Sequence, residues 1–331
     1  MSNRTTPMTP TAVTIPGTEP LRYHRLARTT PGWGRPIATL LLAVLAYVGL
    51  FVAMMLVIIL VGVSNPQWEQ AINQAMANEQ LAPDQPAALV IMLAMLAILV
   101  PACRWAVRMT GRRGGLDSVT GRFRWALFAR ALTPTIVLLA LFGAGSLLLE
   151  PTPVRPLANA GWLALVVLLL VPVQAAGEEY LFRGLLPQVI GRWLRSPLWG
   201  VLLSVPLFVA GHDYNAWGLA GTGAFALGAT YLVWRTGGLE VAIAWHAINN
   251  LFAFGYELLG LTDPNAPVTA SAGMLDLTMT AVTIGVLEWL WRTRWSARFD
   301  AVRPAVAAPT TVNPCTSPIT SGYPTSTPDA C

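Results

Sequence analysis

The 331-residue sequence contains no lysine and few charged residues of any kind. Charged residues make up 11% of the chain, whereas about a quarter of an ordinary soluble domain is charged. Hydrophobic residues, by contrast, make up 54%. So few charges cannot cover the surface of a folded protein of this size, which excludes a water-soluble globule. The apolar residues must face something other than water.

Cysteine is also scarce. The three cysteines, Cys103, Cys315 and Cys331, have neither the spacing of metal ligands nor that of a disulfide framework. They therefore indicate neither a zinc–cysteine site nor a disulfide-stabilised domain, and they leave the redox compartment open.

Long apolar runs are abundant instead. A helix needs roughly 20 apolar residues to span a bilayer, and the sequence predicts eight membrane helices on this basis. Their approximate ranges are 38–63, 86–107, 131–149, 161–190, 197–211, 218–234, 239–259 and 273–291. The predicted fold is all-α, a polytopic membrane helix bundle of about eight transmembrane helices over residues 37–299.

Both ends of the chain differ in composition from these runs. The segment 1–36 begins with a Thr- and Pro-rich stretch, and residues 300–331 are rich in Pro, Thr and Ser. Neither end carries enough apolar residues to form a core, so we predict disordered N- and C-terminal tails. His24, among the arginines of the N-terminal tail, is predicted to be solvated or to lie among lipid headgroups.

The arginines mark the orientation of the bundle. All 21 basic residues are Arg, against 16 acids, which gives a net charge of +5. The predicted outer segments 64–85 and 260–272 carry acids but no Arg, and Arg155 alone lies on an outer loop. This asymmetry follows the positive-inside rule and predicts that both termini are cytoplasmic. The basic charge is therefore topological, and no nucleic-acid partner is predicted. The all-Arg, Ala-rich composition indicates a bacterial source, so the predicted location is a bacterial cell membrane.

Polar side chains gather at three places within the predicted spans, where each ionisable group costs several kcal/mol. Glu179 and Arg183 share a helix face in the favourable order and are predicted to neutralise each other. Glu178 points about 100° away from Glu179 and lacks that partner, so it is the candidate for chemistry. The three segments are EEYLFR at 178–183, FVAGH at 208–212 and HAINN at 246–250.

The two histidines of these segments extend the candidate site. Phe208 and His212 share a helix face, as do His246 and Asn250. A carboxylate near imidazoles takes a proton from water and passes it to a leaving amine. Alternatively, Glu178, His212 and His246 hold a Zn²⁺ ion with an open position for water. Asn250 could donate to the oxyanion of a tetrahedral intermediate. Either way, the implied reaction is peptide-bond hydrolysis within the membrane.

In order along the chain, the three segments resemble the motifs Glu-Glu-x-x-x-Arg, Phe-x-x-x-His and His-x-x-x-Asn. These motifs are similar to those of the CPBP family, which comprises type II CAAX prenyl endopeptidases and bacterial bacteriocin-processing or immunity-associated, Abi-like membrane proteins. The resemblance covers roughly residues 160–255 and implies that this stretch is a catalytic core.

The resemblance also implies a role for each motif residue. Glu178 would activate water, His212 and His246 would position it or bind a metal, Asn250 would assist at the oxyanion, Glu179 and Arg183 would be structural, and Phe208 would shape the pocket.

Taken together, the residues and the resemblance predict an intramembrane endopeptidase. Its substrate is expected to be a membrane-embedded or lipid-associated protein or peptide, cleaved by glutamate- and histidine-activated water with or without Zn²⁺. One alternative is a catalytically silent membrane scaffold whose polar cluster binds a partner. Another is an ion-coupled carrier that uses the same carboxylates as a relay, although no internal repeat supports a carrier.

Overall fold

The computed structural model describes residues 22–29, 32–64, 69–70, 86–112, 115–263 and 266–299. All of them belong to one compact unit, which comprises residues 20–303. Within this part of the chain the elements are helices, apart from an isolated β-bridge between Ser118 and Gly238. The predicted disorder of residues 1–21 and 300–331 falls outside the described residues.

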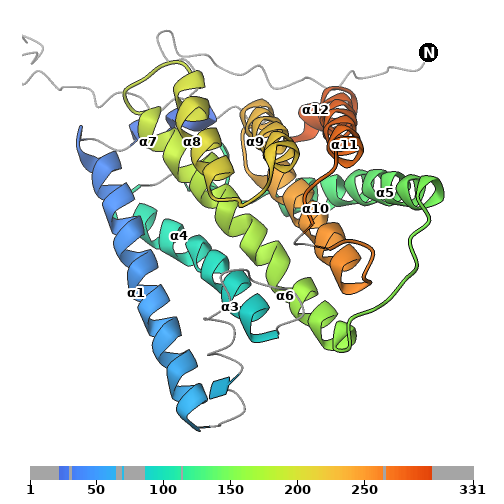
Figure 1. The fold of residues 1–331 in the computed structure, drawn as a ribbon. Helices are drawn as coiled ribbons and strands as arrows, with labels where there is room; N and C mark the ends of the chain where they lie inside the picture. The colour runs from blue at the N-terminus through green and yellow to red at the C-terminus, as the bar shows by residue number, and fades with distance from the viewer. Residues whose placement is uncertain are drawn as a thin grey trace, which may run out of the picture. The chain divides into compact units, whose positions relative to one another are not determined.

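Six helical segments of the described chain are long and apolar enough to cross a membrane. The shorter apolar helix α8 and the helix α10 bring the set to the eight predicted spans, which confirms the all-helical, multi-pass membrane fold (Figure 1). The elements are α1 (Arg35–Ser64), α3 (Pro86–Ala97), α4 (Leu99–Met109), α5 (Trp125–Leu149), α6 (Ala160–Glu179), η2 (Tyr180–Leu185), α7 (Leu186–Ile190), α8 (Leu198–Ala210), α9 (Ala216–Thr236), α10 (Glu240–Leu258), α11 (Ala270–Leu290), η3 (Trp291–Trp295) and α12 (Ser296–Phe299).

Helix α1 illustrates how the bundle meets the bilayer. Its side chains Leu41, Leu45, Leu56 and Leu60 are each more than 60% exposed. In water these residues would form an apolar patch far beyond what a monomeric soluble protein leaves uncovered. In a membrane they face lipid, at no cost.

Helices α6 and α10 form the centre of the bundle. Helix α6 packs against α10 on one side and α3 on the other, as Figure 1 shows. The first half of α10, from Glu240 to Ile248, is buried throughout. Gly177 allows the close approach of α6 to α3, because a Cβ atom there would lie 2.2 Å from the carbonyl oxygen of Leu96. This contact fixes the turn of α6 that carries Glu178 and Glu179.

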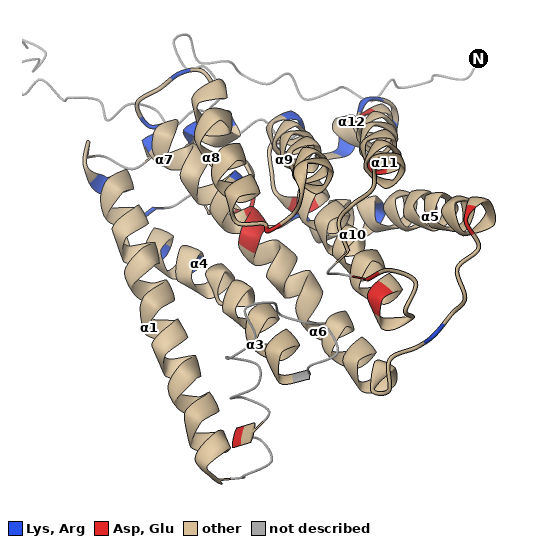
Figure 2. Cartoon of the chain, viewed as in Figure 1, with Lys and Arg blue, Asp and Glu red and all other residues tan. Residues whose placement is uncertain are grey.

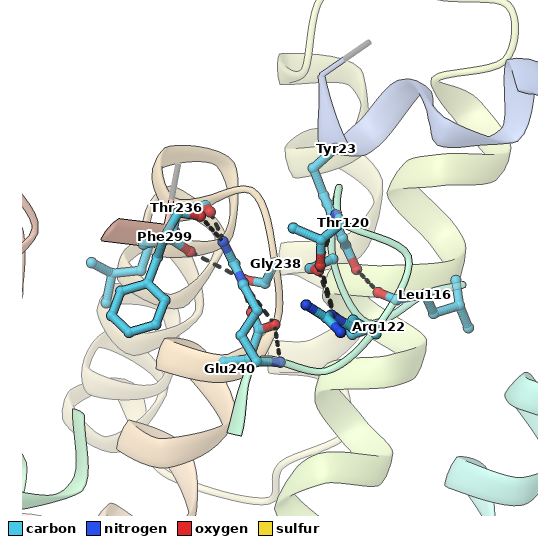
Figure 3. Close-up of polar contacts among 11 residues, drawn as sticks. Tyr23, Leu116, Thr120, Arg122, Thr236, Gly238, Glu240 and Phe299 are labelled. Carbon is cyan, nitrogen blue, oxygen red and sulfur yellow. Dashed lines mark hydrogen bonds and ion pairs between the residues drawn. The ribbon is translucent and has the colours of Figure 1, made fainter. Parts of the chain in front are cut away.

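A buried ion pair holds the start of α10 (Figure 3). Arg124, directly before α5, places Nε 2.9 Å from Oε1 of Glu240 and Nη2 2.8 Å from Oε2. The same guanidinium donates to the carbonyl oxygens of Thr236, at the end of α9, and Phe299, at the end of α12. Four helix ends are thereby joined, and α10 begins from a fixed point less than two turns before His246.

The arginines of the described chain lie mostly at one end of the bundle. Figure 2 shows them around the turn between α7 and α8, the end of α9 and the region of α12, while acidic positions occur at the opposite ends of α5 and α10. This arrangement agrees with the asymmetry in the sequence. Which side of the membrane this end faces stays a prediction.

Part of the N-terminal tail is folded, contrary to the prediction of disorder for residues 1–36. Tyr23–Thr29 forms a 3₁₀ helix, η1, in which Tyr23 and Leu26 are buried. The Tyr23 hydroxyl donates to the carbonyl oxygen of Leu116. Tyr23 and Leu26 lie three residues apart on one face of η1 and anchor it to the bundle. Composition averaged over a long segment hides so short an anchor, which is why the prediction was wrong here.

His24 is likewise buried rather than solvated. Its side chain is 5% exposed, and its Nε2 lies 3.0 Å from the carbonyl oxygen of Arg195. Because a carbonyl oxygen only accepts, Nε2 carries the hydrogen of this bond. His24 therefore joins η1 to the turn between α7 and α8.

Candidate active site

Four stretches of chain meet at the candidate site, and each of its residues contacts at least one other through a hydrogen bond or a ring. The structure thus brings together all the residues that the sequence singled out and adds Gln174. The site comprises Gln174, Glu178 and Glu179 on α6, Arg183 in η2, Phe208 on α8 with His212 just after it, and His246 and Asn250 on α10.

Glu179 and Arg183 form a fully buried ion pair. Nη1 of Arg183 lies 2.9 Å from Oε1 of Glu179, and the two side chains are 1% and 0% exposed. The guanidinium carbon of Arg183 also lies 4.2 Å from the centre of the Phe208 ring, a cation–π contact. The i, i+4 spacing predicted this pair, although residues 180–185 form a π-helical segment rather than a regular α-helix. Such segments frequently occur at functional sites.

His246 lies between the two carboxylates of α6. Its Nδ1 is 2.9 Å from Oε1 of Glu179, and its Nε2 is 3.2 Å from Oε2 of Glu178. Glu179 is ionised because it is paired with Arg183, so it can only accept, and Nδ1 carries a hydrogen. The contact at Nε2 then needs one proton, shared between His246 and Glu178. These two side chains therefore form an acid–base pair.

Gln174 is the site residue that the sequence analysis missed. Its Nε2 donates to Oε2 of Glu178 at 2.8 Å, and its Oε1 accepts from Nδ2 of Asn250 at 3.1 Å. Glu178 thus has a partner on its own helix, where none was predicted from the sequence. One signal was available, because Gln174 is a polar residue inside a predicted span and lies four residues before Glu178.

His212 approaches the pair from the end of α8. Its Nδ1 lies 2.8 Å from the carbonyl oxygen of Phe208, so Nδ1 carries a hydrogen and Nε2 is left with its lone pair when the ring is neutral. The Phe208 ring lies between the two imidazoles, with its centroid 4.8 Å from His212 and 6.0 Å from His246. Phe208 consequently forms an apolar wall of the site, and His212 presents an acceptor beside it.

Tyr214 lies next to His212 in the loop before α9, with ring centroids 5.7 Å apart. Partial burial, together with the negative charges of Glu257 and Glu178, raises the pKa of its phenol. Tyr214 therefore stays protonated at neutral pH, and its pKa depends in part on the charge of Glu178. Sequence reasoning had no reason to prefer it over other loop residues.

The metal prediction finds no ready ligand set. Within the described ranges, no group of three or more His, Cys, Asp or Glu side chains is arranged to hold a metal ion. In the predicted set, both ring nitrogens of His246 face carboxylates, and Nδ1 of His212 is bonded to a backbone carbonyl. Both nitrogens of His246 are thus engaged, whereas Nε2 of His212 keeps a free lone pair, and Zn²⁺ at Glu178, His212 and His246 stays a prediction.

Comparison with known proteins addresses this same stretch of chain. Residues 160–252 match the family model described as type II CAAX prenyl endopeptidase Rce1-like. This segment is similar to that family. Gln174, Glu178 and Asn250, with the other site residues, all lie within it.

A bacterial relative of unassigned function shares part of the sequence. The uncharacterized protein YyaK of Bacillus subtilis (strain 168) is 38% identical over 100 residues, which cover 28% of this chain and 33% of YyaK. The chain therefore matches about a third of that relative's length. No solved structure matches the chain. The family match is thus confined to the stretch that holds the candidate site.

Proposed function

We propose that this protein is an intramembrane endopeptidase that hydrolyses a peptide bond with water activated by Glu178. One observation carries the proposal: Glu178, on the membrane-spanning segment Ala160–Ile190, contacts His246 of the buried helix α10, within the stretch that matches the Rce1-like family model. A buried carboxylate and imidazole that share one proton are suited to move it between water and a leaving group.

In the proposed reaction, the shared proton resides on His246 at the start. Glu178 is then an ionised carboxylate, held by His246 and Gln174, and takes a proton from a water molecule. The water oxygen forms a bond to the scissile carbonyl carbon, and the carbonyl oxygen becomes an oxyanion. The carbon–nitrogen bond then breaks, and the proton on Glu178 passes to the leaving amine. The products are a carboxylic acid and an amine, and Glu178 is ionised again.

The neighbouring groups supply charge and orientation. Glu179 accepts from Nδ1 of His246, so it stabilises the imidazolium, and Arg183 forms an ion pair with Glu179. Asn250 uses one Nδ2 hydrogen for Gln174 and has a second for the oxyanion. His212 offers Nε2 as an acceptor for the attacking water. These roles need no metal ion, although a Zn²⁺ ion held by Glu178, His212 and His246 would supply a more acidic water instead.

The proposed substrate is a membrane-embedded or lipid-associated protein or peptide, because the site lies in helices that cross the bilayer. A test that works before any substrate is identified compares new protein termini in membranes of cells that express wild-type protein or the Glu178→Gln variant. We expect a set of termini that is present with wild type and lost with the variant. The exposed Glu150→Gln, at the end of α5, serves as the matched control and should keep the wild-type set. Identical termini with wild type and Glu178→Gln would instead support a silent scaffold.

A further inference from the structure

Gln174 is a buried amide whose two ends are both bonded inside the site. The side chain is 4% exposed and lies on α6, one turn before Glu178. Nε2 donates to Oε2 of Glu178 at 2.8 Å, and Oε1 accepts from Nδ2 of Asn250 at 3.1 Å. A buried amide within the membrane is costly unless it is hydrogen-bonded, and these two bonds offset that cost.

The chemistry of the two partners fixes the orientation of this amide. A carboxylate oxygen accepts and Nδ2 of Asn250 donates, so only one of the two amide orientations satisfies both bonds. The reverse orientation would place the carbonyl oxygen of Gln174 against the carboxylate of Glu178. Gln174 therefore connects α6 to α10 in a single defined geometry.

We propose that Gln174 is a positioning residue for catalysis, a role that rests on the proposed peptidase function. Its N–H bond holds Oε2 of Glu178 beside His246, where the carboxylate accepts the proton of water. Its carbonyl oxygen accepts one Nδ2 hydrogen of Asn250, which directs the second Nδ2 hydrogen toward the developing oxyanion. One amide thus orients both the general base and the oxyanion donor, which come from different helices.

A merely structural role for Gln174 predicts a different outcome from a positioning role. Helix–helix hydrogen bonds in membranes contribute little to stability, so their loss alone would lower the amount of folded protein only slightly. Loss of positioning changes the kinetics of the folded protein. Its signatures are a fall in kcat without a matching rise in KM, and non-additivity with Asn250.

The chain provides a matched control in Gln188 on α7. Gln188 is a second buried glutamine of the same membrane-spanning segment, with 0% exposure, and neither of its side-chain polar atoms has a partner within the described structure. Replacing Gln188 by Leu changes the same chemical group at a similar depth of burial without touching the site. We expect its kcat and KM to stay within about twofold of wild type.

The experiment uses full-length protein in proteoliposomes and a synthetic peptide that spans a cleavage site found by the termini comparison. For Gln174→Leu we expect kcat to fall about 10- to 100-fold with KM nearly unchanged. Gln174→Met provides a second apolar variant if the Leu protein does not fold. In an Asn250→Ala background, Gln174→Leu should cost much less than it does alone.

The proposal is overturned if Gln174→Leu or Gln174→Met folds and keeps the wild-type kcat, or if its effect simply multiplies that of Asn250→Ala. An equal loss in Gln188→Leu would also overturn it. Failure of the proposed peptidase function has a separate signature, because then no cleavage depends on Glu178 at all.

Discussion

Nδ1 of His246 lies 2.9 Å from Oε1 of Glu179, the same oxygen that accepts from Arg183. One carboxylate oxygen therefore neutralises a buried guanidinium and fixes the tautomer of a buried imidazole. The preceding residue, Glu178, contacts the other ring nitrogen of His246. This geometry gives the adjacent glutamates different roles, with Glu179 orienting His246 and Glu178 available as the base.

Removing one partner of the Arg183–Glu179 pair should destabilise the protein more than removing both charges. Arg183→Met strands the carboxylate of Glu179 in a site that excludes water, and we expect a loss of about 3–5 kcal/mol in the free energy of unfolding. The double variant Glu179→Gln with Arg183→Met removes both charges and should recover part of that loss. Thermal unfolding in detergent micelles measures both. Strictly additive destabilisation would show that the two charges are not coupled.

The Arg124–Glu240 pair offers a test of burial as the deciding factor. Both side chains are nearly inaccessible, at 7% and 0% exposure, so Glu240→Gln should cost about 3–5 kcal/mol of stability. Glu288 contacts Arg235 and Arg292, but Arg292 is 64% exposed, and Glu288→Gln should cost at most about 1 kcal/mol. Equal shifts of the unfolding temperature in these two variants would contradict the importance of burial.

The sequence predicted the helices well because a long apolar run has few alternatives in a bilayer. It also predicted the Glu179–Arg183 contact, which depends only on spacing within one helix. It could not predict that His246 contacts both glutamates or that Gln174 reaches Asn250, because these contacts depend on the separation and rotation of α6 and α10. The docking of η1 was missed for a related reason, since two anchoring side chains leave little trace in composition.

The docking of η1 should depend on pH through His24. Burial, together with the positive charges of Arg25 and Arg22, lowers the pKa of this imidazole below its ordinary value of 6.5. The unfolded segment then binds the proton more readily, so docking is fully stable above about pH 6.5 and weakens as the pH falls below it. Hydrogen exchange of residues 23–29, corrected for intrinsic rates, should show protection at pH 7.5 and less at pH 5.5. His24→Gln should remove the difference, and protection that stays constant in wild type would contradict this role of His24.

Removal of metal ions tests the alternative that His212 and His246 bind Zn²⁺. Because both ring nitrogens of His246 already face carboxylates, we expect cleavage to survive 1,10-phenanthroline as well as it survives the non-chelating 1,7-isomer. Inhibition by the chelating isomer alone, reversed by added Zn²⁺, would show that Glu178, His212 and His246 rearrange around a metal ion.

The most direct measurement is the single-turnover cleavage rate of purified protein in proteoliposomes, compared between wild type and Glu178→Gln. The substituted amide keeps the size of the side chain but cannot take a proton from water. Loss of a general base lowers the rate about 10²- to 10⁴-fold, and that is the fall we predict, with Glu150→Gln unchanged. A Glu178→Gln protein that is folded and cleaves at the wild-type rate would contradict the assignment of Glu178 as the base.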